Sequence, residues 1–148
     1  MQIRVKRFDE LSTHELYSIL RLRSEVFVVE QNCVYQDLDG KDHMALHVIG
    51  TKNSKIVAYT RIFKPGDYFK EASIGRVVVN PLERNHSYGR DIMKASIRTI
   101  ENDLQERSIH LSAQTYLEKF YNSLGFNSEG TEYLEDGIPH IRMIKTLS

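Results

Sequence analysis

Three consecutive valines, Val77 to Val79, are the feature of the sequence that most narrows the fold. A run of β-branched residues without polar alternation is typical of a strand buried on both faces near the middle of a sheet. A polar stretch follows, and a helical period then begins at Tyr88. The apolar residues of that period are Met93, Ile97, Ile100 and Leu104. The sequence therefore predicts a central strand that leads through a polar loop into an amphipathic helix.

The remaining segments predict a mixed α/β domain. Apolar alternation and β-branched residues predict strands at residues 2–8, 46–51, 56–64, 73–79 and 109–113, and a final hairpin around residues 135–137. Helical spacing predicts helices at residues 13–27, 88–107 and 117–124, the first opened by a capping box of Ser12 and Glu15. Residues 28–44 show neither period and form a long loop, which in a compact domain is often functional. No repeat or linker divides the chain, so we expect residues 1–148 to form one domain.

Charge and cysteine content limit the classes of partner. The chain has 20 basic and 20 acidic residues, so no overall field attracts nucleic acid or an anionic membrane. Cys33 is the only cysteine, which excludes an intramolecular disulfide and a zinc site built on several thiolates. No segment approaches the run of about 20 apolar residues that spans a bilayer. We expect a cytoplasmic protein that acts on a small molecule or another protein.

The junction between the central strand and the following helix is the first candidate site. A strand, a polar loop and a helix start leave backbone N–H groups pointing outward at the positive end of the helix dipole, which is a geometry that binds phosphate. The segment has neither a Walker motif nor the dinucleotide pattern of glycines. When this segment is taken alone, an ordinary strand-to-helix turn is the favoured explanation over a phosphate site.

The second candidate site is the short predicted helix at residues 117–124. It carries Tyr121 and ends at Gly125, and Phe120, Leu124 and Phe126 are candidate core residues. Tyr121 alone can be explained as a core tyrosine whose hydroxyl has a hydrogen-bond partner.

Together the two segments closely resemble the GNAT acetyltransferases. The phosphate loop of that family corresponds to Arg84-x-x-Ser87-x-Gly89, and its later Phe-Tyr-x-x-x-Gly-Phe motif is matched in full by residues 120–126. Residues 26–33, 35–37, 74–77 and 136–140 also resemble the ElaA-type branch, so that the resemblance runs from about residue 16 to residue 143. Ser87 departs from the family pattern, which has glycine there, and its Cβ would crowd the backbone against a pyrophosphate.

The resemblance implies a fold and a set of functional residues. The implied fold is the acyl-CoA N-acyltransferase fold, a central mixed and mostly antiparallel sheet with one splayed strand pair, flanked by helices. The implied acetyl-CoA site consists of Val77, Val78, Val79, Arg84, Asn85, His86, Ser87, Tyr88, Gly89 and Arg90. Tyr121 would be the general acid that protonates the leaving thiolate. Glu30 is our first candidate for the base, although a solvated or helix-packing carboxylate is an equal explanation. His47 and His140 are weaker candidates.

The acceptor and the activity leave alternatives open. We expect the acceptor amine to contact Tyr35, Asp37, Arg76, Gln114 and His140. An amino acid, a polyamine, another small metabolite, a protein N-terminus and a lysine all remain open. A module that binds acyl-CoA without turnover and a protein-interaction domain are the competing functions. The exposed final hairpin could pair two copies of the chain in a homodimer.

No metal site is expected. The segment around Asp37 and Gly40 departs from the calcium-loop pattern, because its glycine comes too early and Val48 stands where the closing glutamate belongs. His43 and His47 have Met44 where a zinc protease needs glutamate. Cys33 is expected to be a small hydrophobic residue, since direct transfer needs no thiol nucleophile.

Overall fold

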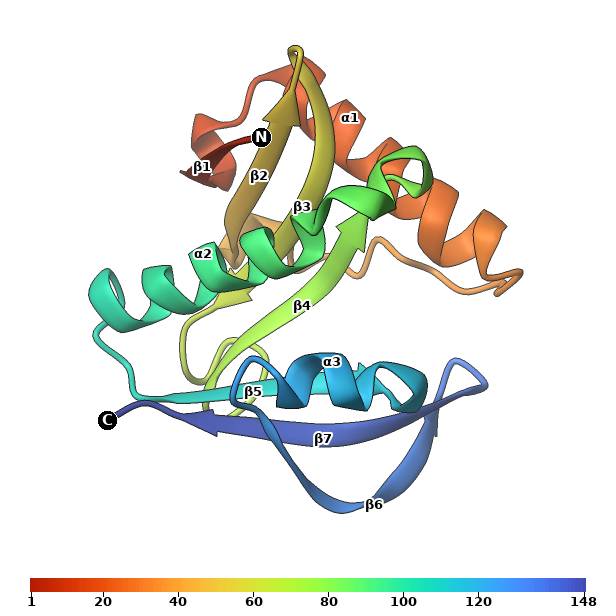
Figure 1. Cartoon of the computed structure of the whole chain (residues 1–148). Coiled ribbons are helices and arrows are strands. Elements are labelled where there is room, and N and C mark those ends of the chain that lie inside the picture. The colour runs from red at the N-terminus through yellow and green to blue at the C-terminus, as the bar shows by residue number, and fades with distance from the viewer.

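The computed structural model describes residues 1–148, which form one seven-stranded sheet with helices on both faces (Figure 1). The strands are β1 (Gln2–Arg7), β2 (Leu46–Lys52), β3 (Lys55–Phe63), β4 (Ala72–Val79), β5 (Ser108–Gln114), β6 (Asn127–Glu135) and β7 (Ile138–Thr146). The helices are α1 (Thr13–Arg23), α2 (Tyr88–Asn102) and α3 (Glu118–Asn122). A π-helix, Ser24–Glu30, continues α1, and single 3-10 turns lie at Phe8–Glu10, Asp42–Met44, Pro81–His86 and Thr115–Leu117. The predicted order of strands and helices is confirmed.

The sheet opens in its middle, between β4 and β5. The strand order is β1-β2-β3-β4-β5-β7-β6, and every neighbouring pair is antiparallel except β4 and β5. Those two parallel strands pair only at Ala72 with Ile109 and at Ser73 with His110, and then diverge (Figure 1). Arg76 has a φ of 50°, and the register between β3 and β4 shifts nearby, so a bulge bends β4 away from β5. This splayed pair in a mixed, mostly antiparallel sheet confirms the predicted fold class.

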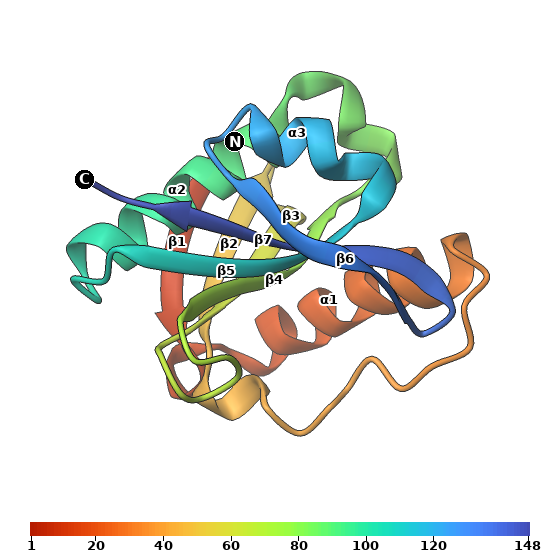
Figure 2. The ribbon, with the colours of Figure 1, turned by 90° about the horizontal axis from the view of Figure 1, so that it is seen from below.

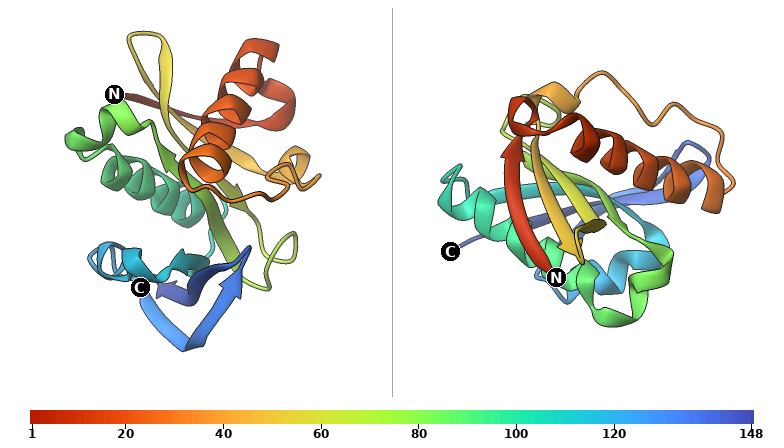
Figure 3. Two further views of the ribbon diagram at one scale, coloured as in Figure 1. Left: turned by 90° about the vertical axis from the view of Figure 1, so that its right-hand side faces the viewer. Right: turned by 90° about the horizontal axis from the view of Figure 1, so that it is seen from above.

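Two hydrophobic clusters fix the helices on opposite faces of the sheet. Helices α2 and α3 cover one face and α1 covers the other, as the views in Figure 2 and Figure 3 show. The predicted apolar stripe of α2 is confirmed, because Met93, Ile97 and Ile100 are buried against the sheet. On the other face, Ile19 of α1 packs with Tyr59 of β3 and Val78 of β4. No helix is both long and apolar enough to cross a membrane.

The first helix and its cap differ partly from the prediction. The capping box is confirmed, since the Glu15 amide donates to Ser12 Oγ at 3.0 Å and the Ser12 amide donates to the Glu15 carboxylate at 2.8 Å. Residues 28–30 were expected in the loop, but they are helical and belong to the π-helix. The loop therefore begins at residue 31, where the chain leaves the helix through Asn32 with a φ of 49°.

The second helix and the central valines also need correction. Helix α2 ends at Asn102 instead of residue 107, because the Leu104 and Glu106 amides bond back to the Thr99 and Ile100 carbonyls and close the helix. No glycine or proline marks this end of the helix in the sequence. Of the three valines, only Val78 is buried, and Val77 and Val79 are half-buried against the hydrophobic cluster under α2.

Candidate active site

A pocket of about 200 Å³ lies where β4 and β5 diverge. Tyr121, the predicted acid, lines it. Four of the five residues predicted for the acceptor also line it, namely Tyr35, Arg76, Gln114 and His140. Asp37 and Glu30 are absent from the lining. The splay thus brings residues from the long loop, β4, β5, α3 and β7 to one cavity.

Tyr121 reaches this pocket from α3. Its side chain is 6% exposed and packs edge-on against Phe120 and Phe126. Burial, with a smaller contribution from Tyr116, raises the pKa of the Tyr121 hydroxyl well above its usual value. The hydroxyl therefore carries its proton at neutral pH.

The open edge of β4 leads to the start of α2. Beyond Ser73 the edge of β4 that faces β5 has no strand partner. The chain then passes through the Pro81–His86 turn, and Ser87 adopts the left-handed conformation with a φ of 61° just before α2 begins at Tyr88. The Ser87 side chain makes no capping bond to the helix. An unpaired strand edge and an uncapped helix start are suited to amide groups and to phosphate respectively.

Arg84 and Glu30 join this loop to the end of the π-helix. Arg84 donates to both carboxylate oxygens of Glu30, at 2.7 and 3.0 Å, and its Nε donates to the Val79 carbonyl at 3.3 Å. The ion pair is partly exposed, with Arg84 at 46% and Glu30 at 37%. The structure thus pairs the predicted base, Glu30, with Arg84 of the predicted phosphate loop, outside the pocket.

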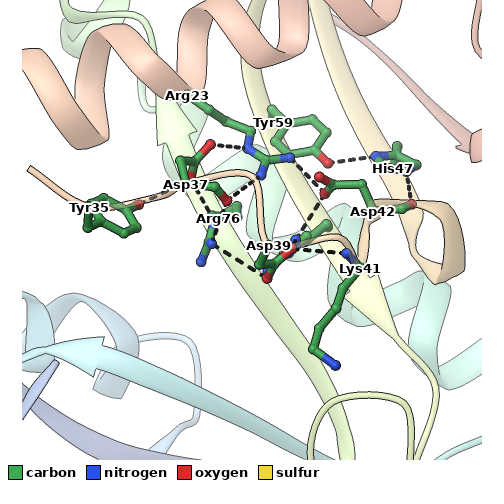
Figure 4. A network of polar contacts seen from close by, with 10 residues as sticks. Arg23, Tyr35, Asp37, Asp39, Lys41, Asp42, His47, Tyr59 and Arg76 are labelled. Atoms are coloured by element: carbon green, nitrogen blue, oxygen red, sulfur yellow. Dashed lines mark hydrogen bonds and ion pairs between the residues drawn. The ribbon is translucent and has the colours of Figure 1, made fainter. Parts of the chain in front are cut away.

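Six charged side chains form a closed ring beside the pocket (Figure 4). In order, the ring consists of Arg23, Asp37, Arg76, Asp39, Arg61, Asp42 and again Arg23. Each carboxylate contacts two guanidinium groups, at distances between 2.6 and 3.6 Å. The carboxylates come from the long loop and the arginines from α1, β3 and β4. The ring therefore fixes residues 37–42 of the loop to the sheet.

Several polar groups extend the ring (Figure 4). The Tyr35 hydroxyl donates to Asp37 at 3.1 Å, and His47 lies between the Tyr59 hydroxyl at 2.6 Å and the Asp42 carbonyl at 2.9 Å. Burial lowers the pKa of His47, so its imidazole is held neutral. Asp37, predicted to contact the acceptor, is 4% exposed and has both carboxylate oxygens in the ring.

The turn between β6 and β7 supplies a pocket wall in which the sequence singled out His140 for the acceptor but not Glu135. His140 Nε2 lies 3.3 Å from the Glu135 carboxylate, and its Nδ1 lies 2.7 Å from the Ile138 carbonyl. Ser112 of β5 donates to Glu135 at 3.3 Å and contacts the Tyr133 hydroxyl. The sequence around Glu135 predicted only a turn, because the residues of a Glu-Asp-Gly sequence are typical of turns and can also belong to a binding site.

The fold and the pocket together define the class of acyl-CoA N-acyltransferases. The crystal structure of an acyl-CoA N-acyltransferase from Pseudomonas aeruginosa superimposes with a TM-score of 0.92 at 35% sequence identity, covering 99% of this chain and 100% of that one.

Within that class, a family model described as an acetyltransferase (GNAT) domain matches residues 10–147, and the chain belongs to this family. Protein ElaA of Escherichia coli is 44% identical over 139 residues, which are 93% of this chain and 91% of ElaA. The crystal structure of Escherichia coli ElaA has a TM-score of 0.89 at 39% identity and covers 98% of this chain and 99% of its own. The predicted resemblance to the ElaA-type branch is confirmed.

Proposed function

We propose that this chain is an N-acetyltransferase that moves the acetyl group of acetyl-CoA to a primary amine of a small-molecule acceptor, such as an amino acid or a polyamine. The amine attacks directly, with both substrates bound in one ternary complex, and the reaction takes place in the cytoplasm. The observation that carries the proposal is the splay of β4 from β5 with Tyr121 in the wall of the resulting pocket.

The proposed acetyl-CoA site uses backbone groups more than side chains. The free edge of β4 at Val77–Val79 suits the amides of the pantetheine arm, and residues 84–90 surround the start of α2 where a pyrophosphate would bind. Two neighbours of the same fold, PaiA N-acetyltransferase from Thermoplasma acidophilum and the NatC complex, have solved structures with coenzyme A, at 14% and 16% identity. That likeness shows the fold, and coenzyme A binding by this chain is our proposal.

Direct transfer requires the protein mainly to position the two substrates and to transfer protons. Acetyl-CoA supplies an activated acyl group whose C–S bond breaks as the new C–N bond forms, and holding both reactants in line supplies most of the rate. Tyr121 gives its proton to the departing sulfur, because burial keeps its hydroxyl protonated.

The acceptor ammonium must lose a proton before it attacks. Glu30 is our predicted base, but it would first have to leave Arg84, to which both of its carboxylate oxygens are bonded. His140 stands in the pocket wall and is the second candidate, acting directly or through water.

Thermal melting with acetyl-CoA, followed by an assay of thiol release with a panel of amines, tests the proposal. A ligand that binds only the native state must raise Tm. We expect a raised Tm and thiol release that depends on the amine. A raised Tm without release from any amine would favour a module that binds acyl-CoA without turnover, and an unchanged Tm would favour the interaction domain.

A further inference from the structure

The charges on the pocket wall are unbalanced once the ion-pair ring is taken into account. The ring holds three guanidinium groups and three carboxylates, so its charges cancel. Arg61 and Arg76, the two basic residues in the lining, both belong to this ring. The other charged residues of the lining are Glu135 and Asp136. With histidine neutral, the wall carries two uncompensated negative charges on a chain whose net charge is zero.

The two acidic residues of the pocket wall lack a basic partner. Arg61, whose guanidinium lies 5.5 Å from the centre of the Tyr68 ring, is already paired with Asp39 and Asp42. In the turn between β6 and β7, Glu135 and Asp136 pair with no arginine or lysine. His140 Nε2, 3.3 Å from Glu135, is the only group there that can become cationic. A second positive charge on an acceptor is therefore favoured at this turn.

An unpartnered hydroxyl in the pocket wall is a second feature that could contact a ligand. Ser73 lines the pocket and is 1% exposed, and its hydroxyl has no hydrogen-bond partner. Buried polar groups in folded proteins nearly always have partners, so a water or a bound molecule supplies one to this hydroxyl in the cavity wall. Ser73 sits at the last paired position of β4 and β5, at the floor of the splay. An amino group can donate a hydrogen bond to its oxygen.

We propose that the acceptor is a small molecule with two amino groups separated by an apolar stem. The amine to be acetylated lies at the floor of the splay, and the second ammonium lies between Glu135 and Asp136. The aromatic and aliphatic side chains between these ends, including Tyr35, Leu117 and Ile138, suit a chain of methylene groups. This inference rests on the proposed acetyl transfer and narrows its acceptor from primary amines in general to dicationic ones.

Three compounds of similar length test the charge preference. 1,5-Diaminopentane, pentylamine and 6-aminohexanoate each present a primary amine at one end, and the other end is positive, neutral or negative. Because the diamine has two equivalent amines, its kcat/KM is divided by two. We expect kcat/KM for thiol release to fall about fivefold at each step in this order, which is the size of a partly exposed ion pair. The preference should weaken as salt is raised from low to physiological concentration. Equal kcat/KM for the three compounds, or a preference for the negative tail, would overturn the proposal.

Two conservative variants and a matched control connect the preference to the turn. Asp136 has a φ of 52°, a conformation that asparagine adopts readily, so Asp136→Asn preserves the turn. Glu135→Gln keeps an oxygen that can accept from Ser112. We expect the double variant to lose most of the preference for the diamine over pentylamine, measured as the ratio of the two kcat/KM values. Glu132→Gln removes an exposed charge from the same strand outside the pocket, and it should keep the preference.

A binding measurement separates this inference from the proposed transfer. Calorimetric titration of the same three compounds into protein saturated with coenzyme A needs no turnover. Tightest binding of the diamine, lost in the double variant, supports the inference even if no acetylated product forms. Equal binding of all three compounds, or binding of none at millimolar concentration, overturns the inference even if acetyl transfer to another amine is observed.

Discussion

At the scale of single residues, the proposed catalytic turnover depends on particular side chains, and Tyr121 is the first of them. Tyr121→Phe removes one oxygen from a buried ring whose packing against Phe120 and Phe126 is kept. We expect kcat to fall about a hundredfold, the usual contribution of a general acid, with little change in the affinity for acetyl-CoA. Steady-state thiol release together with calorimetric titration of acetyl-CoA measures both quantities. Unchanged kcat would remove Tyr121 from the mechanism.

Ser87 shows why the family pattern has glycine at this position. Its φ of 61° and ψ of 24° lie in the left-handed region, where a β-branched side chain is strained. We expect Ser87→Val to lower the free energy of unfolding by about 1 kcal/mol or more, and Ser87→Asn to be nearly neutral. Urea denaturation of the two variants beside the unchanged protein gives the comparison. Equal stability of the valine and asparagine variants would show that the loop relaxes.

The roles of residues that a local sequence pattern marks were predicted from the sequence. The roles that depend on partners far away in the sequence were not. The capping pair Ser12 and Glu15 lies within one turn, so its spacing alone predicts it. Asp42 and Arg61 are 19 residues apart and belong to no motif, so only the folded chain brings them together. Asp37 and Arg76 were singled out for the acceptor, and the structure shows in addition that each pairs with the other and with a further member of the ring.

At the scale of elements, the ion-pair ring is the main contact between the long loop and the sheet. Arg23 is fully buried and bonds Asp37 and Asp42, at 2.9 and 2.8 Å. Arg23→Met would leave both carboxylates without one of their partners, and we expect a loss of about 3 kcal/mol of stability. Thermal or urea unfolding measures the loss, and Arg21→Met at an exposed position two residues earlier in α1 is the control. A loss below 1 kcal/mol would show that the ring contributes little.

The ring also predicts how stability depends on pH. Burial opposes ionisation of Asp39, but its hydrogen bonds and ion pair with Arg61 prevail and lower its pKa to about 2. A carboxyl whose pKa is lower in the folded state stabilises the protein above the unfolded pKa, near 4, and this stability is lost as pH falls toward 2. Because Asp39 is partly exposed and solvent screens its ion pairs, its own contribution is about 1 kcal/mol. The lowered pKa of His47 acts in the same direction at higher pH, below its usual value of about 6.5.

Urea midpoints between pH 7 and pH 2.5 test this dependence. We expect stability to fall most steeply below pH 4, and Asp39→Asn to be less stable at pH 7 but to lose less on acidification. Parallel curves for the two proteins would contradict the assigned role of Asp39.

Element boundaries were predictable only where a local signal marks them. Hydrophobic patterns placed the three helices and the first five strands, and the final hairpin of β6 and β7 was found from the composition of its turn at residues 135–137. The ends of α1 and α2 were wrong, because the π-helix and the backward hydrogen bonds of Leu104 and Glu106 depend on tertiary packing and not on glycine or proline.

At the scale of the whole molecule, the sheet is divided into two parts that meet at a single point. Strands β1 to β4 and strands β5, β7 and β6 share only the pairs at Ala72 and Ser73, so the pocket is a consequence of the topology. The order of elements predicted the strands, but the splay came from the family resemblance, because no local pattern marks where two parallel strands part. Glu135 and Asp136 were not predicted for the acceptor for the same reason, since the pocket wall joins residues about 100 positions apart, such as Cys33 and Asp136.

The central claim is that this pocket transfers an acetyl group to an amine. The most direct measurement is mass spectrometry of a mixture of primary amines incubated with acetyl-CoA and catalytic amounts of the protein, with Tyr121→Phe in parallel. The account predicts N-acetylation of one or a few amines in many-fold molar excess over the protein, and strongly reduced product with the variant. Coenzyme A binding without any acetylated amine, or equal product from the variant, would contradict it.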